Sequence, residues 1–171
     1  MACGSLLTLG GTGIVNAAVR HFPSHKSLSL HHVHTGDKLK LTYFEQGSYL
    51  DDALSEISYL LRDYHTNDVH PIDPALLDQL HDLKLVLGLN RPFHIFSGYR
   101  SPRTNARLRR KCRCAAKRSL HMQGRAIDIH VAGLDTQRIR NAALAMRRGG
   151  VGYYARSDFV HLDTGDVRSW G

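Results

Sequence analysis

A single carboxylate interrupts the most strand-like apolar segment of this 171-residue chain and restricts how the segment can pack. Asp128 stands between Ile127 and Ile129 in residues 126–131, where β-branched side chains predict a strand. A carboxylate among apolar neighbours is costly unless a partner or a metal ion compensates its charge. The segment therefore predicts a sheet strand in which Asp128 either has a functional partner or lies on a polar face.

Two histidines lie in segments that can meet this strand. His121 precedes the turn at Gly124, seven residues before Asp128, and His161 follows the strand-like pair at 159–160. Two imidazoles and one carboxylate supply three ligands for Zn²⁺ and leave the fourth position open for water, as in catalytic zinc sites. Taken singly, each of these residues has the ordinary interpretation of a hydrogen-bonded structural side chain. His130 shares a strand face with Asp128, and we expect it to contact a ligand of the site without binding the metal itself.

A zinc hydrolase also needs a proton acceptor and a group that stabilises the oxyanion. Asp158, three residues before His161, is the preferred general base, and Asp163 is held in reserve because residues 163–165 also read as a turn. Arg100 follows a short apolar segment, where its planar guanidinium suits a carboxylate or a tetrahedral oxyanion. The simpler alternative for Arg100 is a surface arginine.

The remaining pattern predicts one α+β domain with an antiparallel sheet flanked by helices. Period-two alternation predicts a hairpin over residues 27–45, and His31, His32 and His34 within it are interpreted as surface residues. The other expected elements are helices at 53–64 (capped by Ser48 or Asp51), 76–85 (from Pro74 to Gly88), 104–112 and 137–147 (capped by Asp135 or Thr136), and strands at 92–99, 126–131, 151–154 and 159–162.

Residues 1–26 are interpreted as an N-terminal segment outside the domain, which we assign to residues 27–171. Residues 2–19 are uncharged and apolar, which is typical of a secretory signal whose start is truncated, and a plain tail is the alternative. We therefore expect an exported, periplasmic protein without a stable membrane span. Cys3, Cys112 and Cys114 form no disulfide framework or cysteine zinc site, and their role stays open.

Several motifs occur together in the second half of the chain and resemble those of one known family. They are residues 97–102 (SGYRSP), His121 with Asp128, residues 149–154 (GGVGYY), residues 159–165 (FVHLDTG) and residues 167–170 (VRSW). In this order they resemble the YcbK-like (MepK-like) murein endopeptidases. That family is similar to zinc D-alanyl-D-alanine carboxypeptidases, VanX-type dipeptidases and hedgehog-fold proteins.

The resemblance implies one Zn²⁺ held by His121, Asp128 and His161, and peptidoglycan as the substrate and partner. It also implies that Arg100 steadies the substrate carbonyl, and we expect Ser119 and Tyr99 to contact the substrate beside it. Relatives often carry Glu three residues before the last ligand. Asp158 at that position is one methylene shorter.

Three other functions compete with a murein endopeptidase. A D-Ala-D-Ala carboxypeptidase uses the same residues, and a non-catalytic hedgehog-fold protein keeps the zinc but lacks a working base. The formal net charge of +8, with a basic run at residues 107–118, is also typical of a nucleic-acid binder. No aromatic residues interleave that run, so we expect no nucleic-acid partner. The sequence leaves open which cross-link bond is cut and whether the chain oligomerises.

Overall fold

The structure is a computed structural model that describes residues 24–112 and 115–171. Residues 1–23, which contain the predicted signal segment and Cys3, lie outside the described residues, as does Cys114. Within the described residues, no helix is both long enough and apolar enough to cross a membrane.

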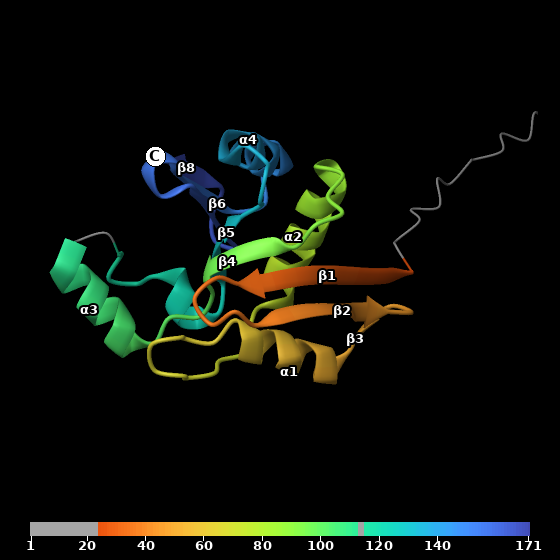
Figure 1. Cartoon of the computed structure of the whole chain (residues 1–171), viewed down its shortest axis with the longest axis horizontal. Helices are drawn as coiled ribbons and strands as arrows, with labels where there is room; N and C mark the ends of the chain where they lie inside the picture. Colours follow the sequence, from red (N-terminus) through yellow and green to blue (C-terminus); the bar gives the residue numbers. More distant parts are fainter. Residues whose placement is uncertain (1–23, 113–114) are drawn as a thin grey trace, which may run out of the picture.

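The described residues fold as one α+β domain, as predicted, with helices grouped around one sheet (Figure 1). The strands are β1 (His25–His32), β2 (Lys38–Glu45), β3 (Ser48–Tyr49), β4 (Phe93–Ser97), β5 (Ala126–His130), β6 (Gly150–Tyr154), β7 (Phe159–Asp163) and β8 (Arg168–Trp170). The helices are α1 (Asp51–Leu60), α2 (Pro74–Val86), α3 (Pro102–Cys112) and α4 (Thr136–Met146), with short 3₁₀ helices at Leu120–Gln123 and Ala155–Ser157.

The eight strands form a single sheet in the order β3-β2-β1-β4-β5-β7-β6-β8. The predicted hairpin is confirmed as the antiparallel pair of β1 and β2, and β5, β7 and β6 are also antiparallel neighbours. The sheet is nevertheless mixed, because β1 runs parallel to β4 and β6 runs parallel to β8. Parallel neighbours need a crossover connection, and α1 and α2 lie in the chain between β1 and β4.

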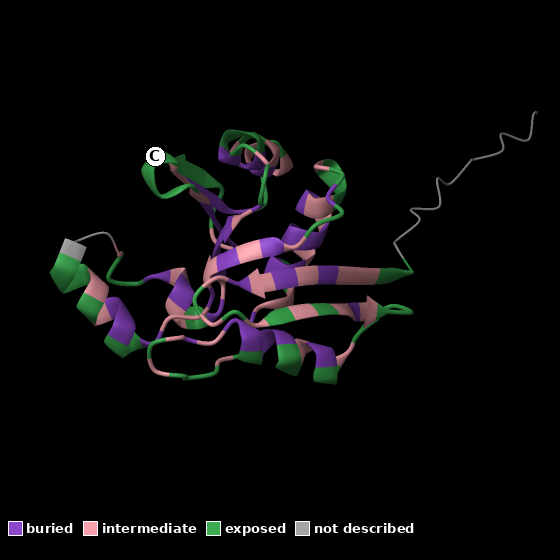
Figure 2. Cartoon of the chain, viewed as in Figure 1, coloured by how far each residue is buried: buried purple, intermediate pink, exposed green. Residues whose placement is uncertain are grey.

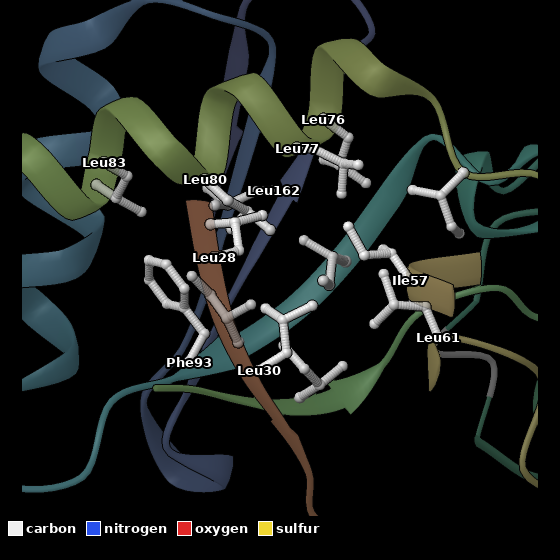
Figure 3. Close-up of a cluster of buried hydrophobic side chains, with 14 of the residues drawn as sticks. Leu28, Leu30, Ile57, Leu61, Leu76, Leu77, Leu80, Leu83, Phe93 and Leu162 are labelled. Atoms are coloured by element: carbon white, nitrogen blue, oxygen red, sulfur yellow. The ribbon is translucent and has the colours of Figure 1, made fainter. Parts of the chain in front are cut away.

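One face of the sheet carries the hydrophobic core. Leucines of α2 point toward Leu28 and Leu30 of β1, with Ile57 of α1 and Phe93 of β4 beside them (Figure 3). Buried and half-buried residues alternate along β1, as expected for a strand with only one face in the core (Figure 2). The opposite face is therefore left to residues that alternate with the core positions.

Helix α2 begins and ends where the sequence predicts. Pro74 occupies its first turn, and the Asp73 side chain caps it by accepting a hydrogen bond from the Ala75 N–H at 2.9 Å. Gly88 follows with a positive φ of 61°, a conformation that glycine adopts without steric cost. For α4, the predicted Asp135 cap is likewise confirmed, with a bond of 2.9 Å from the Gln137 N–H.

Both predicted caps of α1 were wrong. Ser48 lies in strand β3, where it pairs with Glu45, and Asp51 is the first helical residue, so Leu50 takes the capping position without a side-chain bond. The helix also ends earlier than predicted, at Leu60. The next carbonyl, on Leu61, accepts a bond of 2.7 Å from the Tyr99 N–H, which ties this end of the helix to a distant turn.

The interpretation of all three hairpin histidines as surface residues was wrong for His32. Its side chain has no exposed surface, and its Nδ1 lies 3.3 Å from the His34 N–H nitrogen and 3.4 Å from that of Thr35. Nδ1 accepts these bonds and thereby closes the turn between β1 and β2. His31 stays half-buried on the other face of the strand.

Candidate metal centre

The strand register places two of the three predicted ligands directly opposite each other. Asp128, in the centre of β5, pairs with His161, in the centre of the antiparallel strand β7. His121 lies in the 3₁₀ helix Leu120–Gln123, which precedes β5. Gly124 caps the end of this helix with a positive φ of 65°. The chain then turns directly into β5, so the short loop folds His121 over the strand as expected.

The three side chains converge through one atom each. His161 Nδ1 lies 2.9 Å from Asp128 Oδ1 and 3.2 Å from His121 Nε2. His121 Nε2 lies 3.3 Å from the same carboxylate oxygen. All three residues are buried, and among the described residues they form the group of histidine, cysteine and acidic side chains whose geometry can hold a metal ion.

In each ring, the nitrogen that faces away from the cluster is hydrogen-bonded to a fixed partner. The other ring nitrogen therefore directs its lone pair into the cluster. His121 Nδ1 donates to the Gly98 carbonyl at 2.7 Å, and His161 Nε2 donates to Asp163 Oδ2 at 3.0 Å. Partners of this kind fix the tautomer and orientation of metal-ligating histidines. The donor set therefore fits a metal ion, because two imidazole nitrogens and one carboxylate oxygen face a common point.

The electrostatics of the cluster call for a positive charge at that point. Burial alone raises the pKa of Asp128, but His121 and His161 outweigh it and hold that pKa far below its usual range. Burial also lowers the pKa of His161, yet hydrogen bonds to Asp128 and Asp163 raise it to about 9. Burial lowers the pKa of His121. The protein alone thus keeps a proton between His161 and Asp128, where a cation can replace it.

Asp163, the reserve candidate for the general base, contacts the side of the His161 ring that faces away from Asp128. Its side chain has no exposed surface, and Oδ2 also accepts from Arg168 Nη2 at 2.6 Å. Oδ1 accepts from the Gly150 and Gly165 N–H groups and from Arg168 Nη1. With both oxygens engaged, Asp163 is an anchor for His161.

A cavity of about 590 Å³ opens over the three residues. One wall is aromatic and comes from the sheet, with Tyr154, Phe159 and Trp170. The other wall follows α3 and the segment after it, with Leu108, Ala115, Ala116 and Arg118. The cavity therefore offers both an apolar wall and positive charge to a ligand at the cluster.

The structure separates the residues that were predicted to contact the substrate. Arg100 and Ser119 both line the cavity, and Arg100 Nη2 lies 3.5 Å from Asp128 Oδ2 and 3.3 Å from Ser97 Oγ. Tyr99 lies outside the cavity lining and stacks on the ring of His70, with 4.7 Å between ring centroids.

Asp158 and His130 contact each other and not the three clustered side chains. Asp158 Oδ1 accepts a bond of 2.8 Å from Thr136 Oγ1, and its Oδ2 lies 3.2 Å from His130 Nδ1. His130 therefore contacts the predicted base rather than a predicted ligand. Ser157 and Phe159, the chain neighbours of Asp158, line the cavity, whereas Asp158 itself is not among the lining residues.

Sequence reasoning assigned no role to Trp170, which the structure brings to the cluster. Its ring lies 5.2 Å from that of His161, and its Nε1 donates to the Tyr154 hydroxyl at 3.1 Å. An added Cβ on Gly152 would lie 2.6 Å from the indole, so only glycine leaves room for it. The glycines at 149, 150 and 152 were the available signal for such a close approach.

Comparison with known proteins places the whole domain in one family. The family model described as "Peptidoglycan L,D-endopeptidase MepK" (Peptidase_M15_2) matches residues 20–170. The Peptidoglycan L,D-endopeptidase MepK of Escherichia coli strain K12 is 43% identical over 173 residues, covering 96% of this chain and 94% of its own length. The probable enzyme of that name from Haemophilus influenzae is 39% identical over 149 residues, covering 86% and 80%. The chain therefore belongs to the MepK family of M15 peptidases.

Proposed function

We propose that this chain is a zinc peptidase that hydrolyses L,D-peptide bonds in peptidoglycan cross-links. The observation that carries the proposal is the convergence of His121, Asp128 and His161 at the floor of an open cavity. Two imidazoles with one carboxylate are the ligand set of catalytic zinc sites that keep a position for water. Bound there, Zn²⁺ would supply Lewis-acid activation of water and of the scissile carbonyl.

Arg100 provides the second charge that the reaction needs. Its guanidinium is largely buried, lines the cavity, and places Nη2 3.5 Å from Asp128 Oδ2. Negative charge develops on the carbonyl oxygen as the bond is attacked, and a fixed guanidinium stabilises that charge. Arg100 therefore acts as the oxyanion partner.

Asp158 is the proposed general base. The five bonds to Asp163 leave that reserve candidate without a free oxygen, and Asp128 faces the two histidines. Asp158 stands between Ser157 and Phe159, two residues that line the cavity, and its side chain contacts Thr136 and His130. To accept a proton from the attacking water, its side chain must turn from Thr136 toward the cluster.

Arg118 is proposed to bind a carboxylate of the substrate. Arg100 already faces Asp128, and Arg168 is paired with Asp163. Arg118 also lines the cavity, and no ion pair joins it to an acidic side chain of residues 24–112 and 115–171. In an L,D cross-link, a free carboxylate stands on the carbon that bears the leaving nitrogen, so an unpaired guanidinium at the cavity wall matches the substrate.

The stereochemistry in the relatives' names selects among the three bonds that the sequence leaves open. The D-Ala–D-Ala and D-Ala–diaminopimelate bonds both join two D centres. The diaminopimelate–diaminopimelate bond joins an L carbonyl to a D amine. A substrate of this kind lies outside the cytoplasm, so the proposal includes export to the cell-wall compartment, and it gives no role to nucleic acid.

Product identification tests this proposal. Purified wild-type protein with one equivalent of Zn²⁺ is incubated with a mixture of muropeptide dimers that carry either cross-link, and the products are separated by mass. We expect the diaminopimelate–diaminopimelate dimers to become monomers while the D-Ala–diaminopimelate dimers persist. Cleavage of D-Ala-containing bonds instead would favour a carboxypeptidase-like enzyme, and no cleavage would favour the non-catalytic alternative.

A further inference from the structure

A row of rings crosses the sheet on the face opposite the core. His31 of β1, His94 of β4 and His130 of β5 are successive partners in the strand register. Their ring centroids are 5.0 Å apart between His31 and His94, and 6.0 Å apart between His94 and His130. Each alternates with a buried core residue, so the three imidazoles share the face that α1, α2 and α4 leave uncovered.

The row continues without a break into the cavity of the metal centre. Phe96 lies 6.4 Å from the ring of His130 and 5.8 Å from that of Phe159. Phe159 in turn stacks on Tyr154 at 4.5 Å, and both line the cavity. We call His31, His94, His130, Phe96 and Phe159 the ring strip. All five side chains are half-buried, so they present ring surface to solvent.

The ring strip differs in charge from the opposite side of the cavity. Arg118 and the basic helix α3 lie on that side, where they suit the carboxylates of the peptide stem. The strip itself contains no lysine or arginine and ends beside Lys38, the partner of His31. Burial lowers the pKa of His94 and so favours its neutral form. A row of half-exposed rings suits a ligand with apolar faces and hydroxyl edges.

We propose that the ring strip binds the sugar chain of peptidoglycan while a stem peptide of the same polymer enters the metal centre. Pyranose rings present flat C–H faces that pack on aromatic rings, and their hydroxyl groups bond to imidazole nitrogens. The strip is continuous with the cavity through Phe159, so a glycan on the strip delivers its own stem to the metal centre. The inference rests on the proposed function, because it assumes that the stem is the cleaved part.

Binding to peptide-free sugar chains tests the strip independently of catalysis. The probe is a set of soluble murein glycan oligosaccharides from which an amidase has removed every stem. We expect wild-type protein to bind the oligosaccharides and the His31→Ala/His94→Ala variant to bind about tenfold more weakly, since each lost ring contact is worth a few-fold in affinity. His25→Ala, on the same strand but outside the strip, is the matched control and should bind like wild type.

A measurement on the wild-type protein covers the case in which the double variant folds poorly. Histidine ring NMR signals are followed while the oligosaccharide is added. We expect the signals of His31 and His94 to shift and that of His25 to stay. The absence of binding by wild-type protein, or shifts that spare His31 and His94, would overturn the proposal. Shifts of the strip signals with a sugar-free stem dimer in place of the oligosaccharide would also overturn it, in favour of a second stem site.

A comparison of two substrates separates this inference from the proposed function. The ratio of kcat/KM on glycan-linked cross-links to that on sugar-free cross-linked dimers is measured for wild type and the double variant. We expect the ratio to fall about tenfold in the variant. An unchanged ratio would contradict the glycan site alone. Failure of wild type to cleave either substrate would contradict the proposed function. The binding experiments would then show by themselves whether the ring strip binds glycan.

Discussion

The Nε2 atom of His161 lies 3.0 Å from Oδ2 of Asp163, a carboxylate with no exposed surface. This bond turns Nδ1 of the same ring toward Asp128 and His121. The ion pair between buried Asp163 and the more exposed Arg168 holds the carboxylate in place. Asp163 thus orients the proposed ligand His161 without being a ligand itself.

Asp163→Asn should therefore weaken the metal site without removing a ligand. The amide oxygen keeps one acceptor but loses the charge that orients His161 and pairs with Arg168. We expect Zn²⁺ affinity to fall by about tenfold to a hundredfold, as for other partners of metal-bound histidines. Competition with a chromophoric chelator measures the affinity. Asp166→Asn, in the same loop, is the control, and equal affinity in both variants would contradict this role.

Asp158→Asn tests the proposed base. We expect kcat on L,D cross-linked dimers to fall by a factor on the order of 10²–10⁴, the range typical of general-base removal. Because Asp158 contacts Thr136 and His130 and none of the three proposed ligands, zinc content should match that of wild type. Unchanged turnover in a zinc-loaded variant would remove Asp158 from the mechanism.

Gly152→Ala should displace the indole of Trp170. An added Cβ would lie 2.6 Å from the indole ring, and crowding of this kind costs about 1–3 kcal/mol. Trp170 is the chain's single tryptophan, so its fluorescence reports directly on this wall of the cavity. We expect lower stability and a red-shifted emission.

The double variant Gly152→Ala/Trp170→Ala is the control for that prediction. If the Cβ and the indole compete for one space, their effects on the free energy of unfolding are strongly non-additive. Additive effects, or an unchanged emission of Gly152→Ala, would show that the indole does not depend on this glycine.

The elements that the sequence predicted well are those specified by neighbouring residues. The hairpin of β1 and β2 follows from alternation around a turn, and α2 follows from Pro74, its leucines and Gly88. The end of α1 and strand β8 depend instead on distant partners, the Tyr99 N–H and strand β6. Local propensity contains no information about such partners, which explains why the end of α1 and the parallel pairing of β8 were not predicted.

The candidate site was predictable to a similar extent. Asp128 and His161 were singled out because polar residues in apolar strands are costly without a partner, and His121 because it precedes the turn that leads into the strand of Asp128. The position of Asp158 against Thr136 was not, because it depends on where α4 begins relative to the turn before β7. Trp170 reaches His161 only through a strand at the end of the chain.

The burial of His32 predicts an acid-dependent loss of stability. Burial, with the nearby charges of His34 and Arg62, lowers the pKa of His32 from 6.5 to about 4. The opposing effect of the Asp37 charge is smaller. The unfolded chain therefore binds this proton more tightly than the folded chain. The contribution of neutral His32 is present above pH 6.5 and is lost as the pH falls toward 4, at a cost of up to about 3 kcal/mol.

Urea unfolding at a series of pH values measures this loss. We expect the free energy of unfolding of His32→Asn to fall less steeply than that of wild type between pH 6.5 and pH 4. His25→Asn, at the exposed start of β1, should retain the wild-type slope. Parallel curves for wild type and His32→Asn would contradict the assignment.

Metal content per chain tests the central claim most directly. Wild-type protein, His161→Ala and the control His25→Ala are dialysed against trace Zn²⁺, and bound metal is measured by elemental mass spectrometry alongside hydrolysis of L,D cross-linked dimers. We predict one zinc per chain and full hydrolysis for wild type and His25→Ala, and neither for His161→Ala. Full hydrolysis by a metal-free His161→Ala protein would contradict the account.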